Sequence, residues 1–308
     1  MVIAEPAIVV LTGIASLLVG GNSLSACSGT LIGARVVNKT AGVGLAALGY
    51  VLGLALEGKK LELLRREVVS GSSATSISLT LLVIIVILVL GQMTRVPVSL
   101  SQALVGATIA LALHQGMPIR GSYLLLIMAA WLVGPVVAAV LAGTGVILHD
   151  RLAVEDVWRR LRISKVLLIF VAFFTAYSLG ANTLGLIVTF SPVEFNVTLL
   201  VAGVGATVGA FVLGSGVARR IGERMYSLTY STALYSQMAG SMIVEAATQL
   251  GVPISVTQTV TSGIIGAAYS RKYRILNRRS VLLVVSSWLI APLLGFEATF
   301  LALSVVPV

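Results

Sequence analysis

Four short stretches of small, amide and hydroxyl side chains interrupt a chain that is otherwise strongly apolar. The first two are Gly20–Thr30 and Pro97–Gln102, and the second two are Ser178–Gly185 and Pro253–Gln258. Where a helix begins, its first backbone N–H groups have no partner within the helix and lie at the positive end of the helix dipole, so they suit an anion. We therefore predict that these stretches start half-helices whose N-termini converge on an oxyanion.

The predicted binding site draws on both halves of the chain. For any single stretch, close packing between membrane helices is the competing interpretation, because Ser, Thr and Gly are common at such contacts. Four stretches in corresponding positions favour a binding site instead. We expect no catalytic and no metal-ligating residues, since the two histidines lie far apart in the sequence. The predicted substrate-binding residues are Asn22, Ser23, Ser25, Ser99, Ser101, Gln102, Asn182, Thr183, Ser255, Thr257 and Gln258.

The composition is that of a membrane protein. Of 308 residues, 57% are hydrophobic and 10% are charged, whereas soluble domains carry roughly 25% charged residues. Repeated apolar stretches predict an all-α integral membrane protein with about ten transmembrane helices, some of them broken into half-helices. The net charge of +10 does not indicate nucleic-acid binding, because Lys and Arg are confined to short loops between the apolar stretches. The single cysteine, Cys27, cannot form an internal disulfide.

The chain contains an internal duplication, because landmarks of the first half recur in the second half in the same order. We expect a first repeat over residues 1–148, a cytoplasmic linker over 149–165 and a second repeat over 166–308. Each half counts five spans, an odd number, so the two repeats enter the membrane in opposite directions. The landmark pairs, at offsets of 160, 156 and 157 residues, are Asn22 with Asn182, Pro97 with Pro253, and Trp131 with Trp288.

Positive charges orient the predicted spans. Alternate loops on one side, among them residues 149–165, hold 16 of the 21 Lys and Arg residues. The side rich in Lys and Arg is cytoplasmic, which predicts a multi-pass protein of the cell membrane with both termini outside. The pairs Gly49 with Gly53 and Gly205 with Gly209 are typical of helix packing, and they permit a homodimer.

Glu245 lies inside an otherwise apolar segment. A carboxylate within a membrane is costly and is by default a functional hypothesis. Burial would favour its protonated form and make it a plausible proton carrier, so Glu245 is a candidate coupling residue. The alternative is a shift of the span that lets Glu245 reach the adjacent loop.

The four stretches resemble motifs of the inorganic phosphate transporter (PiT) family, which includes sulfate permeases. Gly20–Ala26 and Leu179–Gly185 are similar to its G-A-N-D-V-A-N motif, and Pro97–Gln102 and Pro253–Gln258 are similar to its P-V-S-T-T-H motif. The resemblance implies secondary transport of inorganic phosphate through an inverted-repeat fold, driven by Na+ or H+. We expect alternating access, with the two halves rocking around the site.

The chain departs from these motifs at their ionisable positions. The motif aspartate, which the resemblance would make a cation ligand, is Ser23 in the first half and Thr183 in the second, and the histidine is Gln102 and Gln258. The coupling cation, Na+ or H+, therefore stays open, and no cofactor is expected. The expected partners are phosphate or sulfate and the lipid bilayer. The alternatives are a sulfate permease, a non-coupled anion channel and a non-transporting membrane protein.

Overall fold

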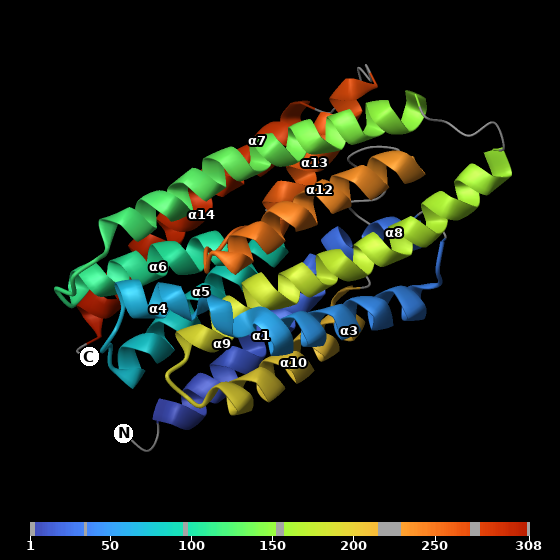
Figure 1. Ribbon diagram of the computed structural model, residues 1–308. Coiled ribbons are helices and arrows are strands. Elements are labelled where there is room, and N and C mark those ends of the chain that lie inside the picture. The colour runs from blue at the N-terminus through green and yellow to red at the C-terminus, as the bar shows by residue number, and fades with distance from the viewer. Residues whose placement is uncertain are drawn as a thin grey trace.

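The structure is a computed structural model that describes residues 4–33, 36–94, 98–151, 157–214, 229–271 and 278–306. Within these ranges the chain forms an elongated bundle of helices and contains no β-strand (Figure 1). The predicted all-α class is therefore confirmed. Across the same ranges, seven helices are long and apolar enough to cross a membrane, so the chain is a multi-pass membrane protein.

The helices run up and down along the long axis of the bundle. Helix α1 begins and helix α14 ends at the same end of it, which we call the terminal end (Figure 1). The elements, including a 3₁₀ turn (η1) and a π-helical turn (η2), are α1 (Ala4–Cys27), α2 (Gly29–Gly33), α3 (Lys39–Glu57), η1 (Gly58–Leu61), α4 (Glu62–Val68), α5 (Ala74–Thr94), α6 (Leu100–His114), α7 (Gly121–Arg151), α8 (Val157–Leu179), η2 (Gly180–Leu184), α9 (Gly185–Phe190), α10 (Phe195–Val212), α12 (Tyr230–Gln249), α13 (Val256–Ser270) and α14 (Arg278–Val305).

Helices from the two halves of the sequence pack against each other. The most extensive contacts join α1 to α10, α6 to α14 and α7 to α13. Each of these pairs takes one helix from the first half and one from the second. The largest hydrophobic core therefore contains residues of both halves, and a binding site between the halves is built from both.

Glycine allows the contact between α6 and α14 to be close. A Cβ atom on Gly106 would lie 2.0 Å from the carbonyl oxygen of Pro292, and one on Gly295 would lie 2.0 Å from that of Ala103. Small residues at such positions let membrane helices approach until their backbones touch. The start of α6 is thereby fixed against a long helix of the other half.

The two Gly-x3-Gly pairs also serve contacts within the chain. A Cβ on Gly53 of α3 would lie 1.9 Å from the carbonyl oxygen of Tyr177 in α8, and one on Gly209 of α10 would lie 1.9 Å from that of Leu17 in α1. The prediction that these glycines pack helices together is confirmed. Because both faces are occupied by the chain itself, they do not offer the homodimer surface that the motif suggested.

Helix α1 passes through the first predicted break without interruption. Its hydrogen-bonded turns continue past Gly20 and Asn22 to Cys27, and the helix stops only at Ser28. The prediction that a half-helix starts at Asn22 is therefore wrong. Gly20 serves close packing instead, because a Cβ there would lie 2.1 Å from the carbonyl oxygen of Ala206 in α10.

The second predicted break is a local widening of a continuous helix. Between α8 and α9 the chain makes the π-helical turn η2, so no new helix begins at Asn182. A π-helical turn inserts a residue into the helix and re-aims the side chains around it, and such turns are frequent at functional sites. Gly180 opens the turn against α3, where a Cβ would lie 2.1 Å from the carbonyl oxygen of Tyr50.

Helices α6 and α13 are the half-helices that the other two stretches predict. Each has 15 residues, fewer than the roughly 20 that a full crossing requires. Each begins directly after a serine N-cap, Ser99 in one and Ser255 in the other, and the two caps are 156 residues apart. The duplicated sequence thus forms the same local structure twice.

Part of the predicted linker is helical. Helix α7 continues to Arg151 and α8 begins at Val157, so the described residues of the expected 149–165 linker belong to these two helices. Several of the basic residues that oriented the prediction, among them those of segment 215–228, lie outside the described residues. The positions of the termini relative to the cytoplasm stay a prediction.

Candidate functional site

All four polar stretches contribute residues to the wall of one cavity of about 30 Å³ inside the bundle. The stretch Ser178–Gly185 contributes through its π-helical turn. The cavity volume exceeds the roughly 10–15 Å³ that a single buried water needs. Apolar side chains close part of its wall, and every polar residue that lines it was predicted from the sequence. The polar lining residues are Asn22, Ser23, Ser99, Ser101, Thr183, Ser255 and Thr257.

The two half-helices begin in the cavity wall. The hydroxyl oxygen of Ser99 accepts the N–H of Gln102 at 3.4 Å, and that of Ser255 accepts the N–H of Gln258 at 3.3 Å. These bonds cap the helices. They leave the first two N–H groups of each helix without an acceptor in the helix itself.

The uncapped N–H groups belong to residues that line the cavity. They are those of Leu100 and Ser101 in α6 and of Val256 and Thr257 in α13. Two helix N-termini thus point at one small space, and each contributes about half a positive charge from its dipole. The arrangement suits an anion without any cationic side chain.

The half-helices leave the cavity in opposite directions. At the far end of α6 the ring of His114 contacts Phe300 of α14, with 5.8 Å between ring centroids, near the terminal end. Directly after α13, Arg271 donates to Asp150 of α7 at 2.7 Å, at the opposite end of the bundle (Figure 1). The two N-termini therefore meet from opposite sides in the interior.

Gln102 and Gln258 do not line the cavity. The side-chain amide of Gln102 donates to the side-chain oxygen of Gln258 at 3.2 Å, and the amide of Gln258 donates to the carbonyl oxygen of Trp131 at 3.2 Å. Both glutamines are buried. Their bond joins α6 to α13 next to the caps, so the structure places them where they hold the two helix starts together.

Asn182 also lies outside the cavity lining. Its amide nitrogen donates to the hydroxyl of Thr248 at 2.9 Å and to the carbonyl oxygen of Val252 at 3.0 Å, and its amide oxygen accepts the N–H of Ile254 at 3.0 Å. The side chain is fully buried. Asn182 therefore fixes the segment that leads into Ser255, whereas Asn22, its counterpart in the sequence, lines the cavity.

Two parts of the prediction fall beyond the described residues. The side chain of Ser25 is one, and Pro97, which precedes the first cap, is the other. Among the described residues that line the cavity, none is Asp, Glu, His, Lys or Arg. Over the described chain as a whole, no group of His, Cys, Asp and Glu is arranged to hold a metal ion.

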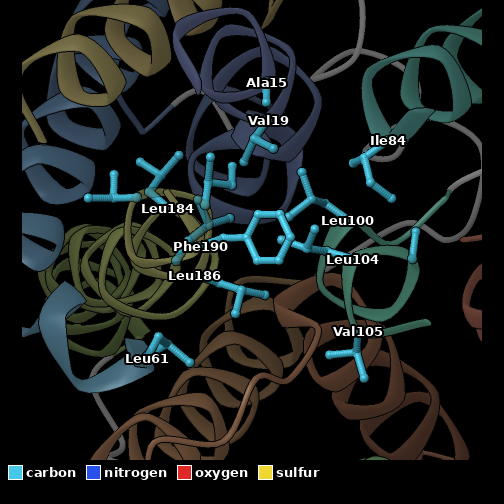
Figure 2. Close-up of a cluster of buried hydrophobic side chains, with 14 of the residues drawn as sticks. Ala15, Val19, Leu61, Ile84, Leu100, Leu104, Val105, Leu184, Leu186 and Phe190 are labelled. Carbon is cyan, nitrogen blue, oxygen red and sulfur yellow. The ribbon is translucent and has the colours of Figure 1, made fainter. Parts of the chain in front are cut away.

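Sequence reasoning missed an apolar cluster next to the cavity. Figure 2 shows the ring of Phe190 lying between Leu184 and Leu186 on one side and Leu100 and Leu104 of α6 on the other. Leu100 belongs to both the cluster and the cavity wall. Because Leu100 is the first residue of α6, the cluster lies directly beside the cavity. A single phenylalanine at the end of a helix gives no signal of this role in the sequence.

Glu245 is not among the residues that line the cavity. The amide nitrogen of Gln249 donates to its carboxylate at 2.5 Å and to that of Glu57 at 2.8 Å, and the Ser178 hydroxyl is 3.5 Å from Glu245. Lys60 pairs with Glu57 at 3.3 Å. Glu245 is partly exposed and stands in a polar cluster near the end of α12, and its role in coupling stays a prediction.

A family comparison agrees with this geometry. The sequence profile described as the phosphate transporter family matches residues 19–168 and residues 154–298. The chain belongs to this family. The resemblance that the four motifs carry is therefore confirmed, and the family and its fold are those of transporters.

Relatives in this family are similar over almost the whole chain. The "Putative phosphate permease MJ0630" of Methanocaldococcus jannaschii is 22% identical over 288 residues, 92% of each chain. The sulfate permease CysP of Bacillus subtilis is 21% identical and covers 93% of this chain and 83% of its own. A solved structure of "the sodium-dependent phosphate transporter" matches with a TM-score of 0.86 at 17% identity, covering 98% of both chains. At that identity the match shows a shared fold.

Proposed function

We propose that this chain is a secondary active transporter that moves inorganic phosphate across a cell membrane by alternating access. The observation that carries the proposal is the meeting of two half-helix N-termini, from α6 and α13, at one hydroxyl-lined cavity inside a membrane bundle. Membership of the phosphate transporter family supports phosphate as the substrate. The seven charge-free polar side chains fit transport, because neutral donors bind an oxyanion and also release it.

The same proposal includes about ten transmembrane helices, two of them half-helices, in two inverted repeats. Helix α12 has 20 residues and adds a full-length helix to the seven apolar spans. The half-helices α6 and α13 complete five elements in each half. Their opposite directions support the inversion, and both termini then lie outside the cell.

Alternating access requires one side of the cavity to be closed while the other is open. We infer that the apolar cluster around Phe190, which shares Leu100 with the cavity wall, closes the side towards the terminal end. Asn22, Ser23 and Thr257 are partly exposed, whereas Leu100 and Thr183 are buried. This asymmetry supports a state that is accessible from the opposite end. Rocking of the two halves would separate α6 from α9 and exchange the open side.

Glu245 remains our candidate for coupling, as a proton carrier. It shares the amide of Gln249 with Glu57, and Lys60 and Tyr177 are the other titratable groups facing this pair. The Ser178 contact links Glu245 to α8, whose last residue, Leu179, lines the cavity. Protonation of Glu245 would thus act on the helix whose last residue lines the cavity. A sodium-driven mechanism is the competing proposal.

Uptake of radiolabelled phosphate into proteoliposomes that contain the purified chain tests the function. We expect accumulation above the outside concentration when a proton or sodium gradient is imposed. Flux that only dissipates a phosphate gradient would identify a channel, and the absence of flux would identify a non-transporting protein. Either outcome would overturn the proposal. The sulfate permease of Bacillus subtilis favours sulfate as the second candidate substrate, which competition in the same vesicles measures.

A further inference from the structure

Two fully buried hydroxyl groups of helix α1, those of Thr12 and Ser16, have no hydrogen-bond partner in the part of the chain that the structure describes. The same holds for Ser236 and Thr299, which stand singly on α12 and α14. A buried hydroxyl in a helix commonly donates to the carbonyl oxygen four residues earlier, as that of Thr108 does at 2.6 Å. A buried polar group without a partner destabilises the state that contains it, so the pair on α1 needs an explanation.

Thr12 and Ser16 lie between the cavity and the terminal end. Helix α1 begins at that end (Figure 1), and it reaches the cavity wall at Val19 and Ser23. Thr12 precedes these two residues by 7 and 11 positions, which are close to whole numbers of turns at roughly 3.6 residues per turn. The three side chains therefore share one face of α1. Ser16, four residues after Thr12, continues this polar column towards the cavity.

Apolar packing closes the space beside this column. Ile8 and Ala15 are buried and belong to the largest hydrophobic core. Figure 2 shows Ala15 of α1 together with the cluster around Phe190. The column of Thr12 and Ser16 therefore borders an apolar core that offers no hydrogen bonds to a hydroxyl.

Small size does not explain the two hydroxyls. Membrane helices pack closely through small side chains, and glycine already fills that need on α1, where a Cβ on Gly13 would lie 2.9 Å from the side chain of Val201 in α10. Valine has nearly the shape of threonine, and alanine lacks only the hydroxyl of serine. Either residue would fill the space at Thr12 or Ser16 without an unpaired polar group.

A passage for an anion would supply the missing partners. An oxyanion and its water need hydrogen-bonding groups along the way, and a hydroxyl both donates and accepts. Alternating access shuts the passage on one side while the other side is open, so hydroxyls on the shut side lose their partners when apolar side chains pack over them. Their cost then falls on the shut state, which brings its free energy nearer to that of the open state.

We propose that Thr12 and Ser16 line the passage through which the anion moves between the cavity and the terminal end, and that their hydroxyls are hydrogen-bonded only in the state open to that end. The proposal rests on the proposed function, because it assumes alternating access. It adds the route on one side of the cavity and two residues outside the cavity wall that set the rate of transport. They take no part in holding the bound anion.

Replacing Thr12 by valine tests the passage, because valine keeps the shape of the side chain and removes the hydroxyl. We expect Thr12→Val to raise the melting temperature of the purified chain, since an unpaired buried hydroxyl disappears from the shut state. We also expect it to slow uptake of radiolabelled phosphate into proteoliposomes by about tenfold, because the open state loses a hydrogen bond while the shut state becomes more stable.

Thr108→Val is the matched control. Its hydroxyl is equally buried but is bonded within its own helix, so this variant should melt no higher than the unaltered chain and should transport at the unaltered rate. Three results would overturn the proposal: a Thr12→Val variant that melts higher but transports normally, one that melts lower, or an equal slowing by Thr108→Val. An unaltered chain that fails to accumulate phosphate would instead refute the proposed function, so the two proposals fail in distinguishable ways.

Access from the side of the termini gives a second, independent test. Thr12→Cys and Thr108→Cys are compared in a Cys27→Ala chain, which lacks the buried native thiol. A membrane-impermeant, negatively charged thiosulfonate is added on the side of the termini during transport. We expect modification of Thr12→Cys and none of Thr108→Cys. A transporting chain in which Thr12→Cys stays unmodified, or in which both thiols react equally, would contradict the passage.

Discussion

Asn22 and Asn182 hold corresponding places in the two halves, yet we expect their replacement by alanine to have different effects. Asn182→Ala removes three hydrogen bonds and leaves the buried carbonyl oxygen of Val252 and the buried N–H of Ile254 without their side-chain partner. Each buried group left unpaired costs about 1–3 kcal/mol. The variant should therefore lose about 2–6 kcal/mol of stability, and its anion affinity should fall because Ser255 is displaced.

Asn22→Ala should act mainly on binding. Asn22 is partly exposed and lines the cavity, so we expect its loss to weaken anion binding and to lower stability by less than the loss of the fully buried Asn182. Thermal unfolding in detergent, followed with and without saturating sulfate, separates the two effects. The account predicts that without ligand the melting temperature falls further for Asn182→Ala than for Asn22→Ala. Equal melting temperatures for the two variants would refute the assignment of Asn182 to the framework.

Three further predictions follow from the packing and the polar cluster. Gly106→Ala forces a Cβ to within 2.0 Å of a backbone carbonyl oxygen of α14 and should lower the melting temperature, whereas Gly44→Ala, whose Cβ meets nothing within 4 Å, should be neutral; equal effects would contradict the close contact. Phe190→Ala removes the ring from a buried cluster and should lower the free energy of unfolding by about 3–5 kcal/mol, measured by the same melting assay. Unchanged stability would contradict the close packing of this cluster. Glu245→Gln should make anion uptake into proteoliposomes insensitive to an imposed pH gradient, and a preserved response would exclude Glu245 as the proton carrier.

The half-helices could be predicted because their signal is local. A proline followed by a serine cap and an apolar segment of about 15 residues specifies a helix start by backbone chemistry alone. The same pattern in both halves made Ser99 and Ser255 predictable as a pair. Seven polar residues of the predicted set line one cavity. Their corresponding positions in the two halves of the duplicated sequence had predicted a common site.

The glycine-rich break was misread because glycine has two uses in membranes. Gly20 permits either a break or a close contact, and the choice depends on Ala206, which is far away in the sequence. The role of Asn182 was hidden for a similar reason. Nothing in its local sequence indicates that its amide faces residues 252–254 across the bundle. The sequence does predict a span at α12, which is absent from the seven apolar helices because its Ser, Thr, Gln and Glu residues lower its mean hydropathy.

Equilibrium binding of sulfate and phosphate to the Ser99→Ala/Ser255→Ala double variant tests the central claim most directly. The claim is that the paired starts of α6 and α13 hold the oxyanion. Each cap lost should cost about 0.5–2 kcal/mol of stability, so the variant should still fold, as its melting temperature would verify. We predict that the folded variant binds both anions at least about tenfold more weakly than the unaltered chain, because each lost hydroxyl donated to a charged ligand. Unchanged affinity in a folded variant would contradict the account.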